Sequence, residues 1–176
     1  MKLFCEIAII IISACLIASC NSGKNIAKEA TIPAKASIPC SESGISDNVF
    51  FRASANATSS SISLAREKAI AAAKSELGKA IIANTLSTAE KYASETGVSD
   101  RTNFSKRIEL ITNQVVDQTI SGISIICENY SESNSRYTTY IAVEIEKQTV
   151  IDKICELTIK QINDFNEEKF KMLFNK

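Results

Sequence analysis

The segment from about Ser61 to Ser94 constrains the fold more than any other part of the chain. Small and apolar residues recur in it every three or four positions, at Ala65, Ala69, Ala72, Ala73, Leu77, Ala80 and Ile81. This is the spacing of one face of an α-helix. Alanine has a high helix propensity, and its short side chain lets a helix lie close against a sheet. The segment therefore predicts one long helix, begun by an N-cap among Ser59, Ser60 and Ser61 and packed on a sheet.

Three segments alternate between apolar and polar residues, as half-buried strands do. They are Val49–Ala57, Ile123–Tyr130 and Arg136–Glu146. The residues expected to face the core are Val49, Phe51, Ala53 and Ala55; Ile123, Ile125 and Cys127; and Tyr137, Thr139, Ile141, Val143 and Ile145. The polar turn Ser131–Ser135 joins the last two strands into an antiparallel hairpin. The outer face of this sheet is polar, so we expect it to be solvated or to meet a partner.

Two more helices complete the predicted domain. One spans about Asp100–Gln118 after a stop at Gly97, and it either continues the long helix around a kink or folds back on it. The other runs over about 149–173, and its Phe165, Phe170 and Leu173 are expected to pack locally. The alternative is that the charged end of this helix lies on a membrane or on a partner helix.

The fold class is therefore α+β, with about three antiparallel strands against a long Ala-rich helix in a single domain at 47–176. So narrow a sheet favours a homo-oligomer.

The first nineteen residues have the pattern of a lipoprotein signal peptide. Lys2 precedes an apolar run of eleven residues, Ile7 to Ile17, which is far shorter than the roughly 20 residues that span a bilayer. Ile17-Ala18-Ser19-Cys20 then fits the bacterial lipobox, in which an aliphatic residue and two small residues precede the cysteine that accepts lipid. Lipid attachment at Cys20 is thus predicted, with an ordinary signal peptide cut elsewhere as the alternative.

Two or three acyl chains on Cys20 would hold the protein on a membrane without a transmembrane helix, at about 0.8 kcal/mol per buried methylene. Asn21 stands where an Asp would favour retention in the inner membrane. The predicted location is therefore the outer membrane of a Gram-negative cell envelope.

Residues 20–46 are expected to be the lipidated cysteine followed by a flexible tether. The stretch is rich in Ser, Ala and Lys, and it contains both prolines, Pro33 and Pro39. Beyond it, Cys40, Cys127 and Cys155 remain after the signal peptide and the lipid site are set aside. One disulfide with a free thiol and three buried thiols both satisfy this count.

The composition argues against several classes of function. The chain has 20 Lys+Arg against 20 Asp+Glu and lacks the basic excess that supports nucleic-acid binding. It contains no His, which removes the commonest catalytic bases and metal ligands. We therefore expect a protein without enzymatic activity that binds no metal ion and no cofactor apart from the covalent lipid.

Five segments over about residues 49–150, together with the lipobox, carry a resemblance to a known family. The segments are FFRASANA, LAREKAIAAAKSELGKAI, IELITNQVVDQ, ISGISIICENY and RYTTYIAVEIEK. In this order of strand, long helix, helix, strand and strand, the chain resembles the Lpp-twenty-type family of bacterial membrane lipoproteins. The resemblance implies a small α+β outer-membrane lipoprotein without a catalytic motif, and some relatives are associated with flagella. Where relatives often carry Gly in a turn, this chain has Ala55-Asn56-Ala57.

The function expected from these observations is that of a non-enzymatic envelope component that binds copies of itself or another envelope protein. One alternative is a carrier of a small molecule or glycan in a groove between helix and sheet, with Tyr130, Tyr137 and Tyr140 as stacking platforms. Another is a hydrolase that works without His, through carboxylates or a Ser-Lys pair.

Overall fold

The structure is a computed structural model that describes residues 37–176. Its elements, in chain order, are η1 (Glu42–Gly44), β1 (Phe50–Ser59), α2 (Ile62–Thr96), α3 (Arg101–Thr119), η2 (Ile120–Gly122), β2 (Ser124–Ser133), β3 (Arg136–Glu146), α4 (Lys147–Ile159) and α5 (Glu167–Phe174). The predicted α+β class, a small antiparallel sheet against a long helix, is confirmed. The predicted signal peptide (1–19), the lipid-accepting Cys20 and the tether as far as residue 36 lie outside the described residues.

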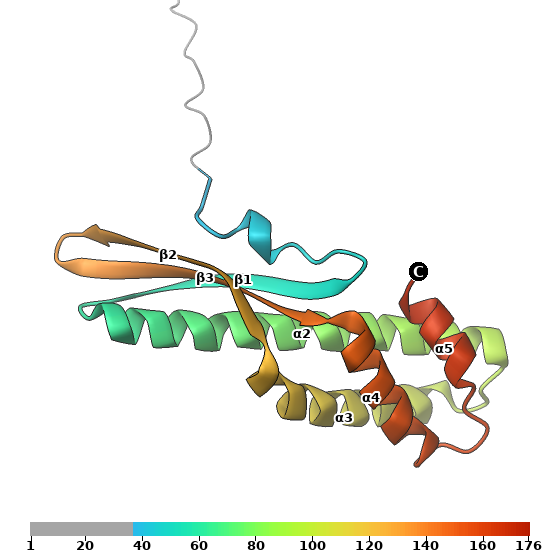
Figure 1. Cartoon of the computed structure of the whole chain (residues 1–176). Coiled ribbons are helices and arrows are strands. Elements are labelled where there is room, and N and C mark those ends of the chain that lie inside the picture. Colours follow the sequence, from blue (N-terminus) through green and yellow to red (C-terminus); the bar gives the residue numbers. More distant parts are fainter. Residues whose placement is uncertain (1–36) are drawn as a thin grey trace, which may run out of the picture. The chain divides into compact units, whose positions relative to one another are not determined.

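The elements are arranged in layers around the sheet (Figure 1). α2 runs along one face of the sheet and packs against β1 and β3, while α3 packs on α2 and α4. The short helix η1 lies on the opposite face of the sheet. Within residues 37–176, no helix combines the length and the apolarity that a membrane span requires.

β3 is the central strand of a sheet with the order β1-β3-β2, and both of its neighbours run antiparallel to it. Its predicted bounds, Arg136–Glu146, are those of the structure, and Thr139, Ile141 and Val143 on the α2 side are buried as expected. The hairpin turn consists of Asn134 and Ser135, which both have positive φ (50° and 57°). Two such residues form the type I′ turn whose twist suits a two-residue hairpin.

β2 contains an irregularity that the alternation of its sequence does not reveal. Ile125 pairs with Val143 and Cys127 pairs with Ala142, so one extra residue is inserted between them as a β-bulge. The bulge reverses the alternation, and Cys127 therefore lies on the face away from α2. The prediction that Ile125 and Cys127 share a face is wrong for this reason.

α2 is the long helix predicted from the alanines, within two residues at each end. The face toward the sheet is buried and consists mainly of small residues in its first half, with Ala65, Ala69, Ala73, Leu77 and Ile81 all completely buried. The helix ends at Gly97, whose φ of 70° is the left-handed conformation that glycine adopts without a steric penalty. The chain then folds back, and Gly78 of α2 lies against Val116 of α3.

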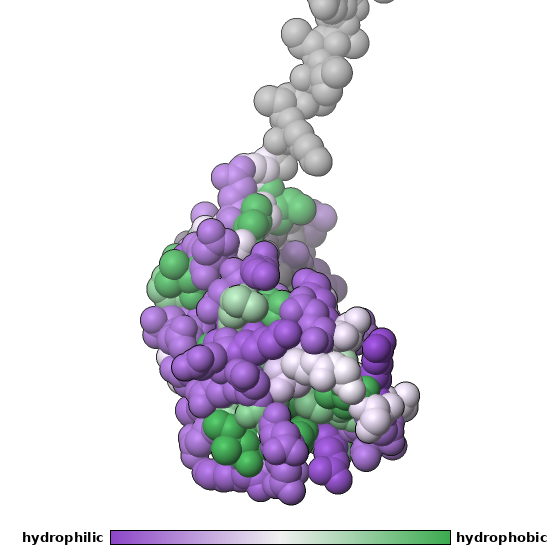
Figure 2. All heavy atoms as spheres, turned by 90° about the vertical axis from the view of Figure 1, so that its right-hand side faces the viewer, coloured by the Kyte–Doolittle hydropathy of each residue, from purple (hydrophilic) through white to green (hydrophobic). Residues whose placement is uncertain are grey.

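The predicted single C-terminal helix over 149–173 is wrong, because the chain turns between α4 and α5. Asp164 in this turn has a φ of 63°, and Asn166 caps α5 by accepting a hydrogen bond from the backbone N–H of Lys169 at 2.9 Å. The turn allows α5 to pack across α2, so that Phe170 and Leu173 are buried. Figure 2 shows this end of the domain as a mostly hydrophilic surface with small, separate hydrophobic patches.

The core lies between the sheet and the helices. Its largest completely buried side chains are Leu77, Ile81, Ile108, Ile111, Ile141, Ile151, Ile154 and Phe170. The burial of each such side chain stabilises the fold by roughly 1.5–3 kcal/mol before the loss of conformational entropy is counted. An aromatic cluster joins the C-terminal turn to this core, because the Tyr92 ring contacts Phe104, Phe165 and Phe170 with centroid distances of 5.4, 5.3 and 5.6 Å.

Candidate functional site

Residues 37–46, which we call the strap, lie on the face of the sheet opposite α2 (Figure 1). η1 contacts β1 and β3. Ser46 continues the attachment, because its Oγ accepts a hydrogen bond from the backbone N–H of Arg52 at 2.8 Å and donates one to the Arg52 carbonyl oxygen at 3.2 Å. The folded unit thus includes the strap and begins by residue 37, whereas the predicted tether extends to residue 46.

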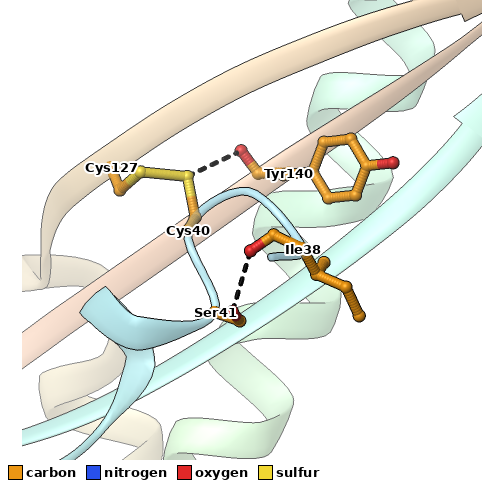
Figure 3. The surroundings of a disulfide bond; sticks show 5 residues. All are labelled: Ile38, Cys40, Ser41, Cys127 and Tyr140. Carbon is orange, nitrogen blue, oxygen red and sulfur yellow. Dashed lines mark hydrogen bonds between the residues drawn. A yellow bond between two sulfur atoms is a disulfide. The ribbon is translucent and has the colours of Figure 1, made fainter. Parts of the chain in front are cut away.

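A disulfide between Cys40 and Cys127 fastens the strap to β2 (Figure 3). The two cysteines are 87 residues apart in the sequence, and their Cα atoms lie 5.6 Å apart. The Sγ of Cys40 also lies 3.7 Å from the carbonyl oxygen of Tyr140 on the central strand. The β-bulge makes this link possible, since it turns Cys127 toward the strap.

Of the two arrangements left open by the cysteine count, the structure has one disulfide and one free thiol. Cys155 of α4 is completely buried. Burial raises the pKa of the Cys155 thiol to about 12. The thiol therefore stays protonated at neutral pH, and a protonated thiol does not attack a disulfide.

Gly44 allows the strap to lie directly on β1. A Cβ placed on Gly44 would lie 2.5 Å from Cβ of Ser54 and 2.7 Å from its backbone nitrogen, which is closer than real Cβ atoms approach other atoms. No side chain fits between η1 and the strand at this point. Ser54 pairs with Ala142, and Ala142 is completely buried although it lies on the face away from α2. The strap therefore covers the middle of the face that was expected to be solvated or to meet a partner.

Charged groups support the loop between the strap and β1. Arg52 contacts Asp47 at 2.6 Å and Glu144 at 2.8 Å. The Asp47 carboxylate also accepts the backbone N–H groups of Val49 and Phe50, at 2.7 and 2.8 Å. The bonds from Phe50 and Val49, with a smaller contribution from Arg52, lower the pKa of Asp47 to about 2. The loop is thus held by a carboxylate that remains ionised at neutral pH.

The three tyrosines proposed as a stacking platform do not share one surface. Tyr130 pairs with Thr139 and Tyr137 pairs with Glu132 on the α2 side of the hairpin, whereas Tyr140 lies on the strap side. Tyr130 is 61% exposed. A single platform of three rings is therefore excluded, and Tyr130 remains the exposed ring among them.

The described residues offer no metal centre, because residues 37–176 contain no group of three or more Cys, Asp or Glu side chains placed to hold an ion. Two carboxylates, Glu144 and Glu146, line a cavity of about 370 Å³ between β3, η2 and α4. Glu144 is paired with Arg52, and Glu146 accepts a hydrogen bond from the Thr149 hydroxyl at 3.1 Å. Both carboxylates are thus already engaged in contacts within the protein.

No family model matches this chain, and searches of the curated proteins and of the solved structures found no significant match. The resemblance to the Lpp-twenty-type family therefore stays a prediction from the sequence. The strap was not predicted from the sequence, and the cysteine count left open whether Cys40, Cys127 and Cys155 form a disulfide. The signal that could have revealed the strap is Cys40 itself, a cysteine within a segment that was expected to be a flexible tether.

We expect Gly44→Ala to destabilise the protein by about 1–3 kcal/mol, because the added methyl group forces η1 away from β1. Gly122→Ala is a matched control, since a Cβ on Gly122 has no other atom within 4 Å. Urea unfolding followed by circular dichroism measures both variants. Equal midpoints for Gly44→Ala and the wild type would mean that the strap does not lie on the sheet as described.

Proposed function

We propose that this chain is a lipid-anchored, non-enzymatic component of the bacterial outer membrane whose folded domain acts by binding protein partners. The disulfide between Cys40 and Cys127 is the observation that carries the proposal. Disulfides form and persist in exported proteins and are rare in the reducing cytosol. An exported location agrees with the signal peptide and the lipobox that the sequence predicts at residues 1–20.

The strap supports the same proposal because it connects the anchor to the sheet. The strap is the first described segment of the chain, and in the sequence it follows the predicted lipid site Cys20 and the predicted tether. A force along the tether would reach the disulfide before it reached β1. The covalent bond to β2 would therefore keep the strap attached to the sheet under such a force.

The edge of the sheet supports a contact with protein. β2 pairs with β3 along one side only within residues 37–176, so the backbone groups on its other side are available to another strand. Ile125 and Ile126 at the bulge are 41% and 39% exposed. An edge strand with exposed apolar residues is a site at which a second copy or another envelope protein can extend the sheet.

Replacement of the predicted lipid acceptor tests the anchor. In cells, we expect Cys20→Ser to block processing and to abolish the incorporation of labelled palmitate, because the acceptor thiol is lost. The matched control Cys15→Ser, within the predicted signal peptide, should be processed and fractionate with membranes like the wild type. A Cys20→Ser protein that is still processed and incorporates label as the wild type does would contradict the proposal.

A photo-crosslinking residue at Ile126 tests the contact. Because Ile126 lies at the unpaired edge, we expect it to form a discrete crosslinked species with a second copy or an envelope protein in intact cells. The control is the photo-crosslinking amino acid placed at the exposed Ile159 of α4, where we expect no discrete crosslinked species. Absence of any discrete product at Ile126, or the same products at both positions, would argue against an edge-strand contact.

A further inference from the structure

A cavity of about 270 Å³ lies where the first turn of α2 meets the hairpin of β2 and β3. Its lining consists of Ile62, Ser63, Arg66, Glu128, Tyr130 and Thr139. These residues lie on the α2 side of the sheet, whereas the strap and its disulfide lie on the other side. The cavity is therefore separate from the site described above.

Thr139 gives this cavity a polar group without a partner. The residue is only 2% exposed, and its Oγ1 forms no hydrogen bond within residues 37–176. A buried hydroxyl without a hydrogen bond destabilises a protein, so nearly all such groups are paired in folded proteins. Buried threonines elsewhere in the core follow this rule, since Thr85 of α2 and Thr112 of α3 donate to backbone carbonyl oxygens at 2.9 and 2.7 Å. The Thr139 hydroxyl is an exception, and a ligand with hydroxyl groups would supply the hydrogen-bond partner that it lacks.

An ion pair forms one wall of the cavity. Nε of Arg66 lies 2.7 Å from Oε1 of Glu128, and its Nη2 lies 3.0 Å from Oε2, so the two planar groups are joined by two parallel hydrogen bonds. This bond to Arg66 lowers the pKa of Glu128. The pair holds donors and acceptors in a fixed plane, while its charges cancel each other. Such a wall suits a neutral ligand with several hydroxyl groups better than an anion.

Tyr130 provides an aromatic face at the mouth of the cavity. It is directly opposite Thr139 in the register of the two strands, and 61% of the residue is exposed. An exposed ring on a strand edge can stack against the C–H face of a sugar ring without any rearrangement of the core. The apolar side chain of Ile62, which is 41% exposed, extends this surface.

The beginning of α2 adds free donors. Ser61 is the N-cap residue, but its side chain makes no capping hydrogen bond, and the first turn contains no acidic residue. The first backbone hydrogen bond of the helix is donated by Ala65 to the carbonyl oxygen of Ser61, at 2.9 Å. The N–H groups of Ile62, Ser63 and Leu64 have no acceptor within residues 37–176, so at this helix end they can donate to oxygen atoms of a ligand.

We propose that this cavity binds a neutral saccharide, with a sugar ring stacked on Tyr130 and its hydroxyl groups bonded to Thr139 and to the Arg66–Glu128 pair. This inference goes beyond the proposed function, because it assigns a small-ligand site on the face opposite the strap. It does not depend on the lipid or on the edge contact, so its failure would leave both of those proposals untouched.

The test is a titration of the purified full chain, kept in a mild detergent, with two neutral trisaccharides, triacetylchitotriose and maltotriose. Amide ¹H–¹⁵N spectra report which residues respond. We expect at least one sugar to cause saturable shifts around Tyr130, Thr139 and Ile62, with a dissociation constant on the order of 1 mM or lower. Absence of saturable shifts at these residues with either sugar up to about 10 mM would overturn the proposal.

Matched variants assign the shifts to the cavity. Tyr130→Leu should weaken binding at least about tenfold because it removes the aromatic face, whereas Tyr140→Leu on the opposite face should leave the affinity unchanged. Thr139→Val should weaken binding while leaving the free protein at least as stable as the wild type, because it removes an unpaired polar atom without changing the shape of the side chain. Equal weakening by Tyr130→Leu and Tyr140→Leu, or unchanged binding in both Tyr130→Leu and Thr139→Val, would also overturn it.

Discussion

The disulfide between Cys40 and Cys127 is the interaction on which the arrangement of the strap depends. It closes a loop of 87 residues that contains β1, α2, α3 and the start of β2. In the chain-entropy account, a cross-link that closes a loop of this length stabilises the fold by about 4–5 kcal/mol, mainly because it restricts the unfolded chain. The other contacts of the strap are non-covalent: η1 lies against β1 and β3, with Gly44 directly on Ser54, and Ser46 forms hydrogen bonds with Arg52. The Asp47–Arg52–Glu144 ion pairs hold the loop that follows the strap. Without the disulfide, these contacts alone would have to offset the entropy lost when residues 37–46 become ordered.

The two faces of the sheet have different roles as a result. The α2 side is closed by Ala65, Ala69 and Ala73 in the first half of α2 and by larger side chains further along, and the cavity lined by Tyr130 and Thr139 lies near the hairpin. The strap side is closed at its centre, where Ala142 is buried, and polar elsewhere. The proposed saccharide site and the strap therefore do not overlap, since each lies on its own face of the sheet.

The parts of the fold that local patterns determine could be predicted from the sequence. The bounds of β3 follow from strict alternation, and α2 follows from alanines at helical spacing that end at Gly97. Three features could not be predicted, because each depends on contacts between distant residues. The bulge beside Ile126 decides on which face of the sheet Cys127 lies. The turn at Asp164 depends on the packing of α5 against α2, and the position of the strap depends on a cysteine 87 residues further along the chain.

For the candidate site, the sequence indicated Tyr130 as one of three tyrosines. That Tyr130 and Tyr140 lie on opposite faces, and that the Thr139 hydroxyl has no partner within residues 37–176, follows only from the register and packing of the strands.

The most direct test of the account is the redox state of Cys40 and Cys127 in living cells. Cells that produce the chain are quenched in acid, free thiols are blocked with one maleimide, disulfides are reduced, and the released thiols are labelled with a second maleimide of different mass. The account predicts that Cys40 and Cys127 carry the second label, that Cys155 carries the first, and that Cys40→Ser moves Cys127 to the first label. Detection of Cys40 and Cys127 in wild-type cells with the first label only would contradict both the fastened strap and the exported location.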